Sequence, residues 1–190
     1  MMYVVKIMLC LCASWLLSAC SSAPLVKQPP EWGYEKGAIQ LNFIGDPQLN
    51  LFQKQAHSLT ICLYHLRDLN GFNQLADEKD GLIKLLECKR FDPSVTYSRT
   101  VVIQPNQKLT ESLDRTDGAK YVGIAAGYYT LHKEGSVRSY PIPITEVKKG
   151  SVLVQKAAKM DIDLYFAPQE IKQSTDITKG KITMEGKEKQ

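Results

Sequence analysis

Short segments with β-sheet patterning, separated by turn residues, run through most of this 190-residue chain and constrain its fold more than any other feature. Some alternate apolar and polar residues, as a half-buried strand does, and others are dense in apolar residues, as a strand covered on both faces is. They lie at residues 37–44, 59–66, 95–103, 108–113, 121–131, 137–147, 152–154 and 160–166. About seven to eight short strands with turns between them predict an all-β protein built as a β-sandwich.

One segment breaks this pattern. Between residues 71 and 87, apolar residues such as Phe72, Leu75 and Leu82 recur at helical spacing. Gly81 lies in the middle of the segment, where glycine weakens a helix by about 1 kcal/mol relative to alanine. The sequence therefore predicts a helical insertion at residues 71–87, either two short helices or one kinked helix.

The first 19 residues have the form of a targeting signal. Lys6 precedes an apolar run at residues 7–17 that is short for a membrane span and has the size of a signal-peptide core. The string that follows, Leu17-Ser18-Ala19-Cys20, resembles the bacterial lipobox. This resemblance implies a lipoprotein signal peptide at residues 1–19, cleavage before Cys20, a diacylglycerol on its sulfur and an acyl chain on its amine. The alternative is an ordinary secretory signal cut near Ala19.

The rest of the chain divides into three parts. Residues 20–36 contain three prolines among the ten positions 21–30, so we expect a lipidated, flexible tether. Residues 37–173 form the expected β-sandwich domain, and residues 174–190 form a polar tail that we expect to be flexible. The net charge of +4, from 24 basic and 20 acidic residues, is too balanced for a protein that binds nucleic acid electrostatically.

Two cysteines, Cys62 and Cys88, lie in the expected exported domain. In an oxidising compartment they could form a disulfide, which would stabilise the fold by about 3–4 kcal/mol because it constrains the unfolded chain. The alternative is two buried free thiols, since cysteine packs well as a small apolar side chain. Both alternatives stay open, because the sequence does not give the distance between the two Cα atoms.

No sequence pattern indicates catalysis or a metal site. His57, His65 and His132 are isolated, and the cysteines lack the spacing of zinc ligands. Asp161 and Asp163 alternate with apolar residues, so we interpret them as the solvent face of a strand rather than as an acid–base pair. We therefore expect no catalytic residue, no metal, and no cofactor apart from the covalent lipid on the N-terminal cysteine.

The best candidate for a binding surface is the loop at residues 46–58. Its 13 residues are many for a connection between strands, and long loops in compact domains are often functional. Leu49, Leu51 and Phe52 form an apolar cluster that suits a partner surface if it is exposed. The alternative is that Leu51 and Phe52 fold back onto the core. The tyrosines of residues 121–131 could line a second groove, although strand tyrosines more often fill a core.

The order of these features resembles the TssJ (SciN) family, the outer-membrane lipoproteins of the type VI secretion system. The resemblance rests on the lipobox and on four stretches in the family's order, at residues 44–50, 59–66, 102–105 and 121–128. It implies a transthyretin-like β-sandwich with added helices, no catalysis, and a lipid-anchored position in the outer membrane facing the periplasm. The implied function is to anchor the secretion membrane complex by binding the periplasmic domain of its inner-membrane component, TssM (IcmF-like).

In that family the loop between the first two strands contacts TssM. The resemblance therefore implies that nine residues bind the partner here: Asp46, Pro47, Gln48, Leu49, Asn50, Leu51, Phe52, Gln53 and Lys54. Other subunits of the secretion membrane complex are further implied partners. A lipid at one end of the chain and a binding loop on the rigid sandwich would hold the partner at a high effective concentration.

Two other functions stay open at this point. One is a periplasmic hydrolase of the transthyretin-like type, although those enzymes end in Tyr-Arg-Gly-Ser and this chain ends in Gly186-Lys-Glu-Lys-Gln190. The other is a different lipoprotein assembly factor with a similar sandwich.

Overall fold

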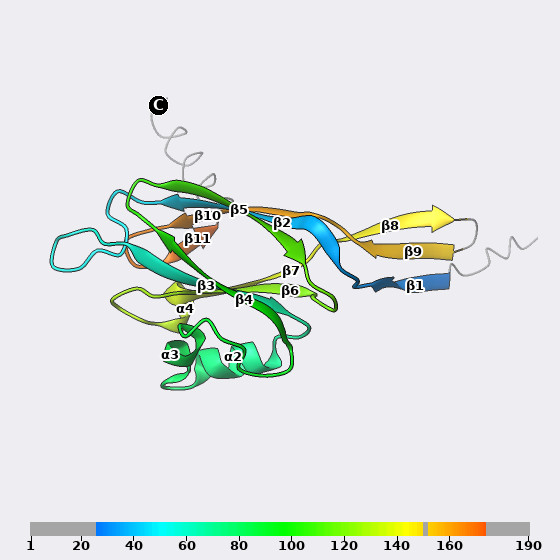
Figure 1. Cartoon of the computed structure of the whole chain (residues 1–190), viewed down its shortest axis with the longest axis horizontal. Coiled ribbons are helices and arrows are strands. Elements are labelled where there is room, and N and C mark those ends of the chain that lie inside the picture. The colour runs from blue at the N-terminus through cyan, green and yellow to red at the C-terminus, as the bar shows by residue number, and fades with distance from the viewer. Residues whose placement is uncertain (1–25, 150–151, 174–190) are drawn as a thin grey trace, which may run out of the picture.

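Two four-stranded sheets make up the main body of the computed structural model, which describes residues 26–149 and 152–173 (Figure 1). The strands of these sheets are β2 (Glu35–Gly45), β3 (Leu59–Leu66), β4 (Val95–Ile103), β5 (Lys108–Arg115), β6 (Tyr121–Ala126), β7 (Val137–Pro141), β10 (Met160–Phe166) and β11 (Ile171–Gln173). One sheet has the order β11-β10-β2-β5 and the other the order β4-β3-β6-β7. These eight strands confirm the predicted β-sandwich.

The main core lies between the two sheets. Ile39, Leu41 and Phe43 alternate along β2 and are buried, and the ring of Phe43 meets Phe166 of β10 edge-to-face with 5.3 Å between centroids. The opposite sheet contributes Ile61, Leu63, Val101, Ile103, Val122 and Ile124 to the same cluster. Each such side chain contributes roughly 1.5–3 kcal/mol on full burial, so this alternation fixes which face of each strand points inward.

A second core covers the other face of β3. Cys62 and Tyr64 point there and pack with Phe72 of α2 (Asn70–Asp77) and with the residues of α3 (Gly81–Leu85). Two short helices therefore form the predicted insertion. Gly81 is required rather than merely tolerated, because a methyl group added to it would overlap the carbonyl oxygen of Leu75. A further short helix, α4 (Lys133–Ser136), leads into β7.

A third sheet projects beyond the sandwich, and we call it the ribbon (Figure 1). Its strands are β1 (Val26–Glu31), β8 (Ile144–Lys149) and β9 (Val152–Ala157), in the order β1-β9-β8. β1 runs parallel to β9, and these two strands lead into β2 and β10, which are also a parallel pair. The ribbon is therefore an extension of the parallel pair at the centre of one sandwich sheet.

The ribbon corrects the expectation of a flexible tether over residues 20–36. Residues 26–31 form strand β1, and β2 already begins at Glu35. Two prolines, Pro29 and Pro30, fit into β1 because it is an edge strand, and its register with β9 shifts at that point. The remainder of the expected tether, the signal peptide at residues 1–19 and the tail at residues 174–190 lie outside the described residues.

Candidate functional site

Asp46 fixes the start of the loop between β2 and β3 through two hydrogen bonds. One oxygen of this carboxylate accepts a hydrogen bond from the backbone N–H of Gln48, at 2.6 Å, and the other accepts one from the hydroxyl of Tyr165 on β10. The hydrogen bond to Asp46 raises the pKa of Tyr165 to about 12, because ionisation would place a second negative charge beside the carboxylate. The loop therefore leaves the sheet in a fixed direction.

Two of the nine residues implied to bind the partner lie inside the protein. Leu49 has no exposed surface and Asn50 is only 5% exposed. The Asn50 amide donates to the carbonyl oxygen of Ser58 at 2.9 Å and accepts from the backbone N–H of Tyr129 at 2.9 Å. This corrects their assignment as contact residues, because an apolar side chain in the core and an amide with both ends engaged serve to shape the loop.

The tip of the loop is a tight turn. Phe52 and Gln55 exchange backbone hydrogen bonds of 2.9 Å in both directions, and the two residues between them, Gln53 and Lys54, have φ angles of 49° and 64°. Positive φ at both central positions is the geometry of a type I′ turn, which usually carries Asn-Gly. The Gln-Lys pair gave no such signal in the sequence. The turn places both side chains in solvent.

Aromatic side chains gather on the surface behind this turn. The ring of Phe52 stacks on that of Tyr129, with 4.4 Å between centroids, and His57 meets Tyr129 edge-on at 4.9 Å. Phe52 is 43% exposed and Tyr129 is 54% exposed. Leu51 is half-buried, so the alternative in which Leu51 and Phe52 both fold back onto the core does not hold. Exposed, rigid aromatic rings are typical anchors of protein–protein interfaces.

Tyr129 reaches this surface because β6 ends earlier than predicted. The strand stops at Ala126, where the backbone N–H of Gly127 bonds the carbonyl oxygen of Thr60 and the chain turns away from the sheet. Tyr128 then points into the core with 2% exposure, while Tyr129 points outward. The sequence does not distinguish the two tyrosines, whereas in the structure Tyr128 is a core residue and Tyr129 is a surface residue.

A hollow of about 470 Å³ lies beside the aromatic rings. Its lining includes Asn50, His57, Thr60 and Tyr129. The Nδ1 atom of His57 is buried and has no hydrogen-bond partner among the described residues. We call Phe52, His57, Tyr129 and this hollow the loop patch.

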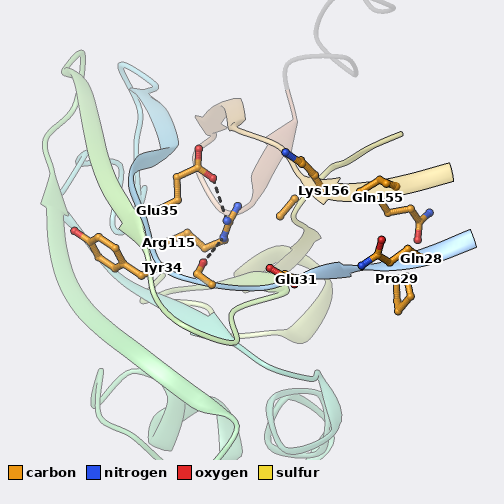
Figure 2. Close-up of a pocket in the computed structure, with 11 residues that line it drawn as sticks. Gln28, Pro29, Glu31, Tyr34, Glu35, Arg115, Gln155 and Lys156 are labelled. Carbon is orange, nitrogen blue, oxygen red and sulfur yellow. Dashed lines mark hydrogen bonds and ion pairs between the residues drawn. The ribbon is translucent and has the colours of Figure 1, made fainter. Parts of the chain in front are cut away.

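A cavity of about 520 Å³ lies where the ribbon joins the sandwich (Figure 2). Arg115 of β5 points into it and is 4% exposed. Its Nε donates to the carbonyl oxygen of Gly33 at 3.2 Å, and its Nη2 lies 3.0 Å from the carboxylate of Glu35. Gly33 lies in the segment between β1 and β2 and Glu35 is the first residue of β2, so the guanidinium holds the bend at which the ribbon leaves the sandwich.

Asp161, Asp163 and His65, the side chains discussed above as possible acid–base or metal-binding groups, make contacts within the fold. Asp161 and Asp163 each accept a 2.9 Å hydrogen bond from the Asn42 amide across the β2–β10 pair, as expected for the solvent face of a strand. His65 has no exposed surface and lies 3.3 Å from the hydroxyl of Thr116 through its Nδ1. Its burial lowers its pKa to about 4, so it is neutral at pH 7.

The remaining assignments concern cysteines, metals and membrane spans. Cys62 and Cys88 are joined by a disulfide whose Cα atoms are 5.0 Å apart, while Cys20 lies outside the described residues. Within residues 26–149 and 152–173, no group of three His, Cys, Asp or Glu side chains is placed to hold a metal ion. The same residues contain no helix with the length and hydropathy needed to cross a bilayer.

Comparison with known proteins gives a family and a set of similar folds. Residues 37–164 match the sequence model of the family described as "Type VI secretion lipoprotein, VasD, EvfM, TssJ". No curated protein matches the chain. The structure of the lipoprotein TssJ1 from Pseudomonas aeruginosa is similar, with a TM-score of 0.51 and 16% identity over 76% of this chain and 95% of that one.

Two further solved structures share the fold. Serratia marcescens Lip, described as a membrane-bound component of the type VI secretion system, is 16% identical with a TM-score of 0.51. A chain from the structure described as "T6SS protein TssM C-terminal domain" from EAEC is 13% identical with a TM-score of 0.54. Each match covers 71% of this chain and 95% of the other. At these low sequence identities, the similarity of this chain to the solved structures is a similarity of fold.

Proposed function

Because the chain belongs to the TssJ family of type VI secretion lipoproteins, we propose that it is an outer-membrane lipoprotein that binds the periplasmic domain of a TssM-like inner-membrane component through the loop patch. The observation that carries this proposal is the stacked, exposed pair Phe52 and Tyr129 on a loop held rigid by Asp46 and Asn50. A preformed loop loses little conformational entropy on binding, so its exposed rings can contribute most of their burial energy to the complex.

The residues of the loop divide between contact and support in this proposal. The accessible side chains that would touch the partner are Pro47, Gln48, Leu51, Phe52, Gln53 and Lys54, together with Tyr129 of the neighbouring loop. Leu49 and Asn50 set the shape of the loop from below, and Asp46 fixes its start. Lys54 at the tip adds a positive charge, which favours an acidic edge on the partner.

Anchoring is proposed to come from the lipid on Cys20. Each buried methylene contributes about 0.8 kcal/mol, so the three chains of a lipoprotein hold the protein on the bilayer far more firmly than one chain would. Labelled palmitate is expected on the wild-type protein and absent from Cys20→Ala, which is also expected to lose secretion activity. Unlabelled wild-type protein would contradict the anchor.

We also propose that the protein is noncatalytic. The candidate acid–base pair, Asp161 and Asp163, is engaged by Asn42, and His65 is sealed in the core. The purified protein is expected to leave a ureide substrate unchanged. Turnover of that substrate would favour the transthyretin-like hydrolase instead.

Affinity purification from the native envelope tests the choice of partner. A tagged, lipidated protein is expected to co-purify a TssM-like protein as its main partner, identified by mass spectrometry. Retention of an unrelated envelope protein, with the TssM-like protein absent, would favour a different lipoprotein assembly factor.

A further inference from the structure

Within the described part of the chain, the ribbon contributes to no hydrophobic core on either of its faces. Val147 is 46% exposed and Ile144 is 45% exposed. Register places Val147 opposite Val154 on one face, while Ile144, three residues away along β8, lies on the other face opposite Ala157. A three-stranded sheet with exposed aliphatic side chains on both faces is expected to have a partner surface.

The free end of the ribbon is the end nearest to Cys20. Val26, Val152 and Lys149 are in register across the three strands, so β1 begins at the end of the ribbon where β8 ends and β9 begins. Val26 follows Cys20 by six residues, which span at most about 20 Å when fully extended. If Cys20 carries lipid, as proposed above, the free end of the ribbon lies within about 20 Å of the bilayer surface.

The charge of the protein is concentrated in the same segment. Residues 26–31 and 144–159 contain five lysines and two glutamates. The rest of the chain from Cys20 onward carries equal numbers of acidic and basic residues, so the ribbon and the residues next to it account for the whole positive charge of the lipidated form. Lysines near a bilayer are attracted to lipid phosphates.

A further protein strand fits the ribbon less well than lipid does. β1 and β8 are its edge strands, but β1 carries Pro29 and Pro30, which have no backbone N–H, and proline on an edge strand disfavours the addition of a further strand. We propose that the ribbon lies against the phospholipid headgroups of the membrane that holds the anchor. Its aliphatic side chains enter the interface and its lysines lie beside phosphate groups, so the ribbon orients the sandwich relative to the bilayer. This inference rests on the proposed lipidation of Cys20.

Photo-crosslinking of the intact lipoprotein tests this contact. A benzophenone amino acid replaces Val147 in the ribbon or, as a matched control, Val102 on β4, which is 47% exposed. Cells labelled with ³²P-phospholipid are irradiated, and lipid adducts on the protein are counted. We expect strong labelling from position 147 and little from position 102. Replacing the exposed Lys156 by glutamine is expected to lower the labelling about fivefold, while Lys108→Gln on β5 leaves it unchanged.

The outcomes separate this inference from the proposed function. If palmitate is present on Cys20 but position 147 gives no lipid adduct, or gives adducts only with protein, the ribbon does not lie on the membrane and the inference is wrong. Equal lipid labelling from positions 147 and 102 would also overturn it. If palmitate is absent from the protein, the proposed anchor itself fails, whatever the crosslinking shows.

Discussion

The side-chain oxygen of Asn50 accepts a hydrogen bond from the backbone N–H of Tyr129 at 2.9 Å, although the two residues are 79 positions apart in the chain. This bond ties the loop between β2 and β3 to the loop after β6, and it holds Phe52 and Tyr129 where their rings stack. The proposed binding surface is therefore built from two loops that depend on one buried amide.

Asn50→Ala is expected to destabilise the fold by about 1–3 kcal/mol, because it removes the hydrogen bonds that the buried amide makes to the carbonyl of Ser58 and to the N–H of Tyr129. The φ angle of Asn50 is 48°, a conformation that asparagine tolerates better than alanine. Urea denaturation of the purified domain measures the loss. Asn73→Ala, at an exposed position of α2, is the control, and equal stability of the two variants would show that the Asn50 amide does not hold the loops.

Reduction of the disulfide between Cys62 and Cys88 is expected to lower the free energy of unfolding. The sequence separation of 26 means that breaking the disulfide frees a sizeable loop in the unfolded chain, at a cost of about 3 kcal/mol in the free energy of unfolding. Reductant is expected to lower the urea midpoint of the wild type and to leave the double variant Cys62→Ser, Cys88→Ser unchanged. A wild-type midpoint insensitive to reductant, with two free thiols found by mass spectrometry, would contradict the pairing.

The burial of His65 is expected to make the stability of the fold depend on pH. Burial lowers the pKa of His65 in the folded state to about 4, below its usual value of 6.5, so the unfolded chain binds more protons between these two values. The free energy of unfolding is therefore highest above pH 6.5 and falls as the pH drops. At pH 5 it is lower by about 2 kcal/mol. Urea titrations at several pH values should show this slope in the wild type and a smaller one in His65→Gln. The same slope in both proteins would mean that His65 is not the group responsible.

Gly81→Ala is expected to destabilise the protein despite the higher helix propensity of alanine. Its methyl group would overlap the carbonyl oxygen of Leu75, which forces α2 and α3 apart and costs about 1–3 kcal/mol. Gly33→Ala is the control, because an added methyl group there meets nothing within 4 Å. Thermal unfolding compares the two variants, and a Gly81→Ala protein as stable as the wild type would contradict the close packing of the helices.

The sequence predicts the sandwich well because periodicity determines it. The alternation of Ile39, Leu41 and Phe43, and the mostly apolar run at residues 59–66, correspond to buried faces in the structure. The ribbon is different. β1 contains two prolines and pairs with a strand more than a hundred residues later, so neither local propensity nor spacing indicates it.

The loop patch was only partly predictable for a related reason. A loop has no period, so the sequence cannot separate Leu49, which is buried, from Phe52, which is exposed three residues later. Tyr129 joins the patch through a stacking contact that depends on where β6 ends, and this in turn depends on its pairing with β3. Long-range pairing, rather than the local sequence pattern, determines which of Leu49 and Phe52 is buried and where Tyr129 lies.

Measuring the affinity of the lipoprotein domain for the periplasmic domain of the TssM-like partner tests the central proposal most directly. Phe52→Ala is expected to weaken binding about 30-fold or more, as for an aromatic interface anchor. Ile83→Ala, which removes a side chain that is 59% exposed on α3, is expected to bind like the wild type. Binding by Phe52→Ala at wild-type affinity, with its fold intact, would contradict the proposal that the loop patch holds the partner.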